Sequence, residues 1–486
     1  MGLGKRSSVP VAQPGPNGGT ALIVAVLAIA VFMSSLDLFI VNLAFPSIAG
    51  EYAGTSLGSL SWVLNAYTII FAAVLIPAGR WADQVGRRRA LVAGLALFTA
   101  GSLLCGLAPG VSWLVAARVV QAVGAGVMVP ASLSLLLAAV PAGQRARALG
   151  SWSALGALGA ALGPVIGGLL VGLGWRWVFW VNLPVGIVAI VLVLRVVSES
   201  RDDAPRGRPD LLGALLLALA VGLVAGALVE APDWGVASVA FVGTLAAAVL
   251  CGVLLVVRSA HRVAPVLELG LFRSRAFSGA GAASVLYFAG FGALVLNTVE
   301  FLTEVWHYTP VQAGLAIAPG PLMVLPFARL VAPRVIPWLG GVGRVAGLGC
   351  GVSAVAQGVW LFSLQADPAY LTHLLPAQLL GGAGVGLVIP SLLGAGSAAL
   401  PAARFGTGSG ILNMVRQVGT VLGVAALVAA LTVPAADPLT VFRHGVVLIV
   451  CFFVAAGAVC VAVLFRQAPS APILPAFPDA RSQEAA

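Results

Sequence analysis

The chain has 486 residues, of which 60% are hydrophobic and 9% are charged, and its formal net charge is +10. A soluble globular domain carries about a quarter charged residues, so this composition excludes a soluble protein and predicts an integral membrane protein. The apolar runs are continuous and of helical length, which also excludes an outer-membrane barrel with its alternating strands.

Fourteen apolar segments are long enough to cross a bilayer as helices. They run over residues 20–44, 59–79, 90–109, 112–140, 146–173, 175–197, 211–230, 235–258, 276–303, 311–331, 342–365, 371–398, 406–432 and 441–466. The first is too long for a signal-peptide core and is interpreted as a retained span. The Gly- and Pro-rich tail over residues 1–19 is expected to be disordered and cytoplasmic.

The basic residues predict how the chain is oriented in the membrane. With the N-terminus in the cytoplasm, Arg176 and Arg443 lie outside and Arg118 and Arg416 lie within spans, while the rest of the 26 Lys and Arg residues lie inside. This asymmetry follows the positive-inside rule for an even number of spans, so both termini are expected in the cytoplasm. The positive charge then reflects topology and anionic lipid, and we expect no nucleic-acid partner.

An internal repeat relates the two halves of the chain at a constant offset of 260 residues. It pairs Gly124, Gly126, Pro130, Pro141, Gly150, Gly159 and Gly163 with Gly384, Gly386, Pro390, Pro401, Gly410, Gly419 and Gly423. Equivalent helices in the same orientation imply two parallel six-helix halves. We therefore expect bundles over residues 20–197 and 276–466, a cytoplasmic linker over 198–210, two accessory helices over 211–258 and a cytoplasmic tail over 467–486.

The fifth span contains a glycine-rich decade, the ten residues 159–168, with a proline at its centre. Pro164 removes a backbone donor, which predicts a kink or a break in the helix. Glycines at spacings of three or four predict a smooth strip for close helix approach, and this strip consists of Gly156, Gly159, Gly163 and Gly167, with Gly168 beside it. A bent helix with a smooth face suits two bundles that rock against each other, although ordinary helix packing is the simpler alternative.

Asp37 lies well inside the first span, where a charged group costs several kcal/mol. Desolvation favours its protonated form, so this carboxyl suits a residue that takes up a proton on one side and releases it on the other. We interpret Asp37 as the proton-coupling residue. The alternative is a structural carboxyl hydrogen-bonded to Asn42 or to a neighbouring helix.

Other polar residues within the spans are candidates for the same machinery. Arg118 is the natural electrostatic partner of Asp37, or else a brace between helices. Glu300 in the ninth span is a second candidate for binding protons or cationic substrate, or a surface acid beside Glu304. The residues expected to line a central cavity are Asn42, Gln121, Asn413, Arg416 and Gln417, and Arg416 alternatively caps a helix contact.

The loop between the second and third spans predicts a cytoplasmic gate. A carboxylate there accepts charge-assisted hydrogen bonds from guanidinium groups or helix N-terminal amides. A solvent-screened pair worth ~1 kcal/mol or less suits a breakable latch. The gate residues are Gly79, Asp83, Gly86, Arg87 and Arg88. The alternative is a basic turn that fixes topology.

These motifs resemble those of the fourteen-span drug:proton antiporter group of the major facilitator superfamily. The resemblance rests on residues 79–88 (GRWADQVGRR), 114–124, 159–168 and 36–46, and it departs from the family at Ala122, where a glycine is usual, and at Phe39, where a threonine is common. It implies an all-α fold of two six-helix bundles plus two accessory helices. It also implies a role for Arg118 in proton transfer or in setting the proton affinity of the acid.

The sequence therefore predicts a proton-coupled exporter of amphipathic drugs or natural products in the plasma membrane. The alternatives are a dedicated exporter of one metabolite or antibiotic, and a membrane sensor or scaffold on a transporter fold. There is no P-loop and a single lysine, so ATP hydrolysis is not expected. The five cysteines lack metal-ligand spacing, and we expect no metal, no cofactor, no enzymatic activity and a monomer.

Overall fold

The computed structural model describes residues 18–52, 54–141, 144–201, 209–398, 405–432 and 437–465. The expected tail over residues 1–19 lies outside this part except for its last two residues, as do residues 202–208 of the linker and the whole tail over 467–486. Within the described ranges, 14 helices are long and apolar enough to cross a membrane.

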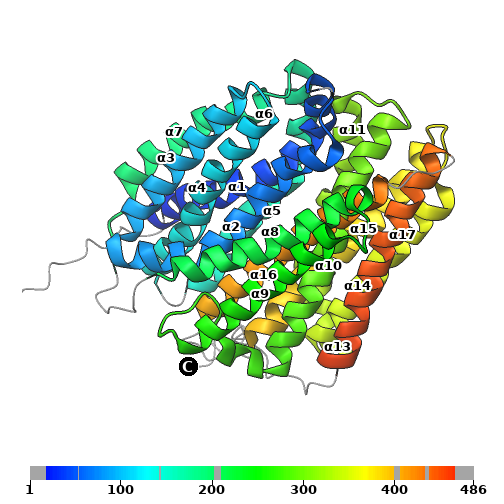
Figure 1. Cartoon of the computed structure of the whole chain (residues 1–486). Helices are drawn as coiled ribbons and strands as arrows, with labels where there is room; N and C mark the ends of the chain where they lie inside the picture. The colour runs from blue at the N-terminus through cyan, green and yellow to red at the C-terminus, as the bar shows by residue number, and fades with distance from the viewer. Residues whose placement is uncertain are drawn as a thin grey trace, which may run out of the picture.

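The first six spans form one half of the molecule, at the blue and cyan end of Figure 1. Their helices are α1 (Gly18–Glu51), α2 (Leu57–Val85), α3 (Arg87–Gly106), α4 (Val111–Ala139), α5 (Arg145–Leu173), and α6 (Trp177–Trp180) with α7 (Asn182–Val196). Helix α5 packs along α1, and α4 packs against both α2 and α3. This arrangement brings the intramembrane polar residues of α1 and α4 together.

The last six spans form the other half. Their helices are α10 (Arg275–Glu304), α11 (Pro310–Ile317) with α12 (Pro319–Pro326) and α13 (Ala332–Leu339), α14 (Val342–Ser363), α15 (Leu375–Ala398), α16 (Phe405–Leu431) and α17 (Pro438–Val459). Short 3₁₀ or π segments lie at Leu269–Arg273, Phe327–Val331, Tyr370–Leu374 and Cys460–Leu464.

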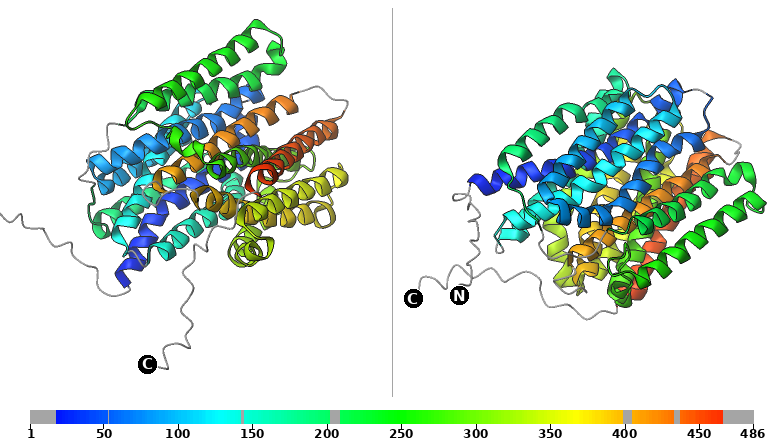
Figure 2. Two further views of the ribbon diagram at one scale, coloured as in Figure 1. Left: turned by 90° about the horizontal axis from the view of Figure 1, so that it is seen from below. Right: turned by 60° about the vertical axis from the view of Figure 1, so that its left-hand side comes forward.

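The accessory helices α8 (Leu211–Trp234) and α9 (Val239–His261) form a hairpin against the side of the molecule. Helix α8 contacts both α2 and α16, one from each half, and Figure 2 (left) shows the green hairpin beside them. Asp210 caps α8 by accepting a 3.0 Å hydrogen bond from the Gly213 amide, and its Oδ1 lies 2.7 Å from Arg258 Nε on α9. The two helices are therefore tied together at the linker end.

The internal repeat appears as matched helix packing. A Cβ on Gly124 of α4 would lie 2.8 Å from the Gly94 carbonyl on α3, and a Cβ on Gly384 of α15 would lie 2.9 Å from the Gly349 carbonyl on α14. Helices approach this closely only where a side chain is missing. The repeated glycines thus mark equivalent contacts in the two halves.

Helices α5 and α1 continue through prolines. Of the kink or break predicted at Pro164, the break is wrong, because α5 is one helix from Arg145 to Leu173. Helix α1 runs past residue 44 and through Pro46, with Phe45 and Ile48 buried. Neighbouring helices and local adjustments satisfy the backbone groups that a proline frees inside a membrane protein.

The tenth span also differs from its expected end at residue 331. It continues to Leu339. A π turn at Phe327–Val331 joins α12 to α13, and a proline lies in the first turn of α13, where a backbone donor is not needed. Arg329 and Arg334, which the positive-inside rule places on the cytoplasmic side, therefore lie on the end of this span.

Candidate functional site

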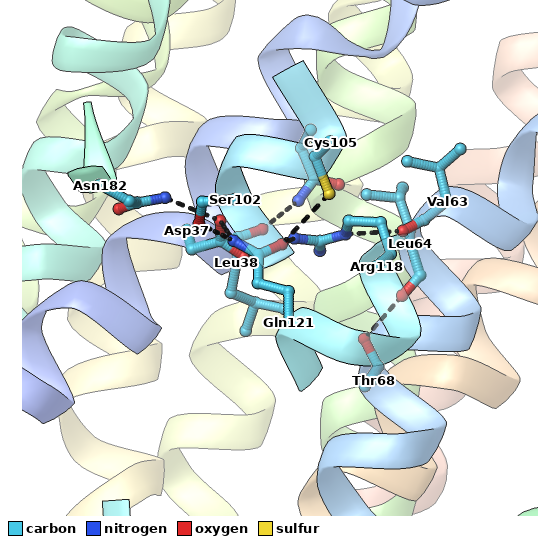
Figure 3. Close-up of polar contacts among 11 residues, drawn as sticks. Asp37, Leu38, Val63, Leu64, Thr68, Ser102, Cys105, Arg118, Gln121 and Asn182 are labelled. Carbon is cyan, nitrogen blue, oxygen red and sulfur yellow. Dashed lines mark hydrogen bonds and ion pairs between the residues drawn. The ribbon is translucent and has the colours of Figure 1, made fainter. Parts of the chain in front are cut away.

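A fully buried ion pair lies within the first half of the molecule (Figure 3). Arg118 Nη1 on α4 lies 2.6 Å from Asp37 Oδ2 on α1, and both side chains have an exposed fraction of 0%. The same guanidinium donates to Gln121 Oε1 at 2.7 Å and, through Nε, to the Val63 carbonyl on α2 at 3.1 Å. The sequence prediction that Asp37 and Arg118 are partners agrees with this geometry.

The pair belongs to a polar cluster that joins four helices. Asp37 Oδ1 accepts from Gln121 Nε2 at 2.8 Å and from Asn182 Nδ2 on α7 at 3.3 Å. Gln121 Nε2 also donates to Ser102 Oγ on α3 at 2.8 Å. Gln121 was expected to line the cavity, but it is buried in this cluster instead, because its amide satisfies both members of the ion pair.

An aromatic face covers the cation of the pair. The Arg118 guanidinium carbon lies 3.9 Å from the centroid of the Tyr67 ring and 5.8 Å from that of Phe179. A cation over an aromatic face is attracted by the negative face of the ring. Tyr67 is also a wall of the central cavity, so it separates the cavity from the ion pair.

The cavity lies between the two halves and has a volume of about 1900 Å³. Its walls come from α1, α2, α4 and α5 on one side and from α10, α12, α15 and α16 on the other, and most of its lining is apolar. Four of the expected cavity residues line it, namely Asn42, Asn413, Arg416 and Gln417. Asn42 donates to the Leu38 carbonyl of its own helix at 2.7 Å and does not hold Asp37.

The cavity reaches the surface at one end of the molecule. There it is lined by gate-loop residues and by Arg201 and Val263, both exposed. The opposite end is closed where α5 meets α11. A Cβ on Gly168 would lie 2.6 Å from the Pro310 carbonyl, and Gly314 lies directly against the Pro164 carbonyl.

The two faces of α5 divide its glycines between two contacts. Gly159 and Gly163 face α1, where a Cβ would lie 2.6 Å from the Phe32 carbonyl and 2.6 Å from Phe39 Cβ, respectively. Gly167 faces Ile40, which also lies on α1, whereas Gly168 faces α11 in the other half. The decade is therefore a packing strip within one half and, at Pro164 and Gly168, the contact between halves.

The gate loop is hydrogen-bonded within its own half. Arg87 Nε donates to Asp83 Oδ1 at 2.7 Å, and Arg88 Nη1 donates to the Val197 carbonyl at 3.2 Å. Glu199 Oε1 accepts from the Arg88 amide at 2.9 Å, which caps the start of α3. These contacts hold the loop to the end of α7, while Gly79 lies near α4 and lines the cavity.

Gly86 occupies a backbone conformation that favours glycine. Its φ is +112°, and a Cβ there would lie 2.9 Å from the carboxyl carbon of Glu199. Arg80 Nη2 in this region lies 3.8 Å from Glu268 Oε1, in the segment between α9 and α10. The contacts around Gly86 thus shape the loop, whereas the longer bridge spans the mouth of the cavity.

Glu300 lies apart from both the ion pair and the cavity. Its side chain on α10 is buried, with an exposed fraction of 9%, and it is not part of the cavity lining. The alternative that Glu300 is a surface acid is therefore wrong, since Glu304 is the exposed member of the two. Glu300 Oε1 has no hydrogen-bond partner among the described residues.

Several site residues escaped the sequence reasoning. Asn182, Ser102 and Tyr67 are polar residues inside apolar spans, which is the same signal that singled out Asp37. Glu199 lay in the linker and carried no motif, so its contact with the gate loop was not predictable from the sequence.

Two six-helix halves with a two-helix hairpin at their side, a cavity between the halves and a buried ion pair behind one wall of that cavity define a membrane transporter. The sequence model of the family described as Major Facilitator Superfamily matches residues 27–424 of this chain. The chain belongs to this superfamily.

Similar proteins are described as drug pumps. The multidrug resistance protein Stp of Mycobacterium tuberculosis is 37% identical over 402 residues, which cover 82% of this chain and 73% of that protein. The drug efflux pump JefA of the same species is 36% identical over 417 residues, which cover 84% of this chain and 79% of that protein. The solved structure of the POT family transporter PepTSo shares the fold, with a TM-score of 0.66 and 15% identity over 94% of this chain and 100% of that one.

Proposed function

We propose that this protein is a proton-coupled antiporter that exports amphipathic drugs or natural products across the plasma membrane by alternating access. The observation that carries the proposal is the buried Asp37–Arg118 pair directly behind the Tyr67 wall of a large, mostly apolar cavity. The similarity to the multidrug resistance protein Stp and to the drug efflux pump JefA supports a drug as cargo. An apolar cavity with few polar groups suits lipophilic molecules.

Orientation follows from the basic residues. With both termini in the cytoplasm, the gate loop and the open end of the cavity face the cytoplasm. The structure then corresponds to an inward-open state, in which the contact between α5 and α11 closes the outer end. Export requires this contact to separate while the gate end closes.

The polar cluster is suited to proton binding and release. Protonation of Asp37 leaves Arg118 without its counter-ion, and an uncompensated buried charge is costly. Arg118 nevertheless keeps neutral partners in the Val63 carbonyl, Gln121 Oε1 and the Tyr67 ring. These neutral partners reduce the cost of losing the counter-ion, which suits a coupling residue.

The gate loop contributes a breakable contact. The Asp83–Arg87 pair is partly exposed and lies within one half, so it costs little to rearrange. When the cytoplasmic end closes, the carboxylate of Asp83 is free to exchange Arg87 for a helix end of the opposite half. Glu300 is a second buried acid available for protons.

Energy comes from the proton gradient, with no bound cofactor and no enzymatic step. One charge moved through 100 mV supplies about 2.3 kcal/mol, so one or two protons drive a substantial substrate gradient. We infer a monomer as the working unit, since the cavity and the polar cluster are both formed within one chain.

The test is transport by the purified protein in proteoliposomes with an imposed pH gradient. A panel of lipophilic compounds should accumulate against their gradients and dissipate the pH gradient, and protein-free liposomes provide the baseline. Transport of a single chemical class would identify a dedicated exporter instead. Absence of any substrate-dependent proton flux would contradict the proposal and favour a sensor or scaffold.

A further inference from the structure

Arg416 places a cation in the wall of the central cavity. It lies on α16 within a bilayer-spanning segment, and it lines the cavity. Its Nη1 donates to Asn413 Oδ1 at 3.1 Å, while its Nε is buried without a hydrogen-bond partner. Across the ranges that the structure describes, no carboxylate forms an ion pair with it. A guanidinium has five donors, so donors on the Nη atoms remain for a ligand after the bond to Asn413.

The carboxylates near the cavity are already engaged or turned away. Asp83 and Glu268 at the mouth are paired with arginines. Asp37 is held in the buried cluster, and Glu300 is not part of the lining. Away from the mouth, the charged group that the described lining presents to a ligand is therefore the cation of Arg416.

An aromatic ring lies over this cation, and two further rings continue from it along the cavity wall. The Arg416 guanidinium carbon lies 4.4 Å from the centroid of the Phe288 ring. Phe291 packs edge-to-face with Phe288 at 5.9 Å and with Phe39 of α1 at 5.9 Å. All three phenylalanines line the cavity, so rings from both halves border the space beside the cation. Flat apolar walls of this kind suit a planar aromatic ligand.

We propose that Arg416 binds an anionic group of the cargo and that the preferred substrates are planar aromatic anions, with an acidic group on Arg416 and rings against Phe288, Phe291 and Phe39. This inference rests on the proposed export function and narrows its substrate class. A guanidinium recognises carboxylate through two parallel charge-assisted hydrogen bonds, which also orients the ligand. A cation inside the membrane gains most from a ligand that neutralises it.

The charge of the cargo also determines how export responds to membrane potential. Exchange of an anion leaving the cell for a proton entering it moves at least two charges down an inside-negative potential. Exchange of a singly charged cation for one proton moves none. An anion exporter is therefore accelerated by potential alone, whereas a one-for-one cation exporter is not.

The test uses two dyes with the same three-ring skeleton and opposite charge. Fluorescein is an anion at neutral pH, and rhodamine 123 is a cation. Their binding to the full-length protein in detergent is measured by fluorescence anisotropy at low and high salt. The variants are Arg416→Gln, Arg416→Lys and, as a matched control, Arg344→Gln, which removes another arginine near a phenylalanine ring but outside the cavity lining.

We expect the wild type to bind fluorescein more tightly than rhodamine 123, and more weakly as salt rises. Arg416→Gln should weaken fluorescein about tenfold or more, the loss expected for one charge-assisted hydrogen-bonded pair, and leave rhodamine 123 within about twofold. Arg416→Lys should recover part of the fluorescein affinity, and Arg344→Gln should match the wild type. Retained rhodamine binding shows that Arg416→Gln is folded.

Equal weakening of both dyes in Arg416→Gln, or fluorescein affinity no lower than in Arg344→Gln, would overturn the inference. So would a wild type that prefers rhodamine 123. If a pH gradient drives the transport of rhodamine 123 but not of fluorescein in proteoliposomes, this inference is contradicted and the proposed export function stands. Fluorescein binding through Arg416 without any gradient-driven transport contradicts the proposed function and leaves the binding site standing.

Discussion

Replacing Asp37 by Asn tests the coupling site most directly. The carboxylate accepts from Arg118 at 2.6 Å, Gln121 at 2.8 Å and Asn182 at 3.3 Å. Removing one member of a buried ion pair costs about 3–5 kcal/mol because the other charge stays buried. Since Arg118 keeps three neutral partners, we expect a loss at the lower end, about 3 kcal/mol. The free energy of unfolding is measured by chemical denaturation in detergent.

The same variant should lose transport driven by a pH gradient while still binding substrate. Asp367→Asn, at an exposed loop carboxylate, is the matched control and should leave both stability and transport unchanged. Adding Arg118→Gln to Asp37→Asn removes the uncompensated cation, so the double variant should be more stable than Asp37→Asn alone. Wild-type proton coupling in Asp37→Asn, or a double variant whose losses simply add, would refute the reasoning.

Three further substitutions probe the gate, the outer contact and the hairpin. Gly168→Ala places a methyl group against a carbonyl of α11, so the transport rate should fall even where the melting temperature changes little. Gly252→Ala, with open space around it, should change neither the transport rate nor the melting temperature. Asp83→Asn breaks a partly exposed pair and should cost about 1 kcal/mol or less in unfolding free energy, yet it should strongly slow transport. Burial by itself raises the pKa of Asp210, but Arg258 and a backbone amide hold it below its usual value. The stability it contributes is therefore present at neutral pH and lost as pH falls through the folded pKa, so Asp210→Asn should destabilise the protein at pH 7 and show a smaller loss on acidification.

The membrane spans could be predicted from the sequence because hydropathy and the positions of basic residues act locally. The errors lie at prolines. The first span was expected to end at residue 44, just before Pro46, and Pro164 predicted a kink or a break, but both prolines lie inside continuous helices. Whether a proline ends a helix depends on the helices packed around it, and a single chain segment does not contain that information.

Part of the site could be predicted for a similar reason. Charged residues inside apolar spans are costly, so Asp37 and Arg118 stood out and their pairing followed from charge. The placement of Gln121 could not be predicted, since a helix face points into the cavity or the core according to tertiary packing. That Arg416 forms no ion pair with a carboxylate among the described residues is likewise a property of the assembled cavity, because it depends on where every nearby carboxylate points.

The hairpin of α8 and α9 makes the molecule unequal on its two sides. It covers the seam where α2 meets α16, whereas the seam between α5 and α12 carries no such cover within the described helices. On the hairpin side, a lipophilic compound in the bilayer contacts α8 and α9 before it can reach the seam between α2 and α16. The two flanks of the molecule therefore present different surfaces to a compound dissolved in the membrane.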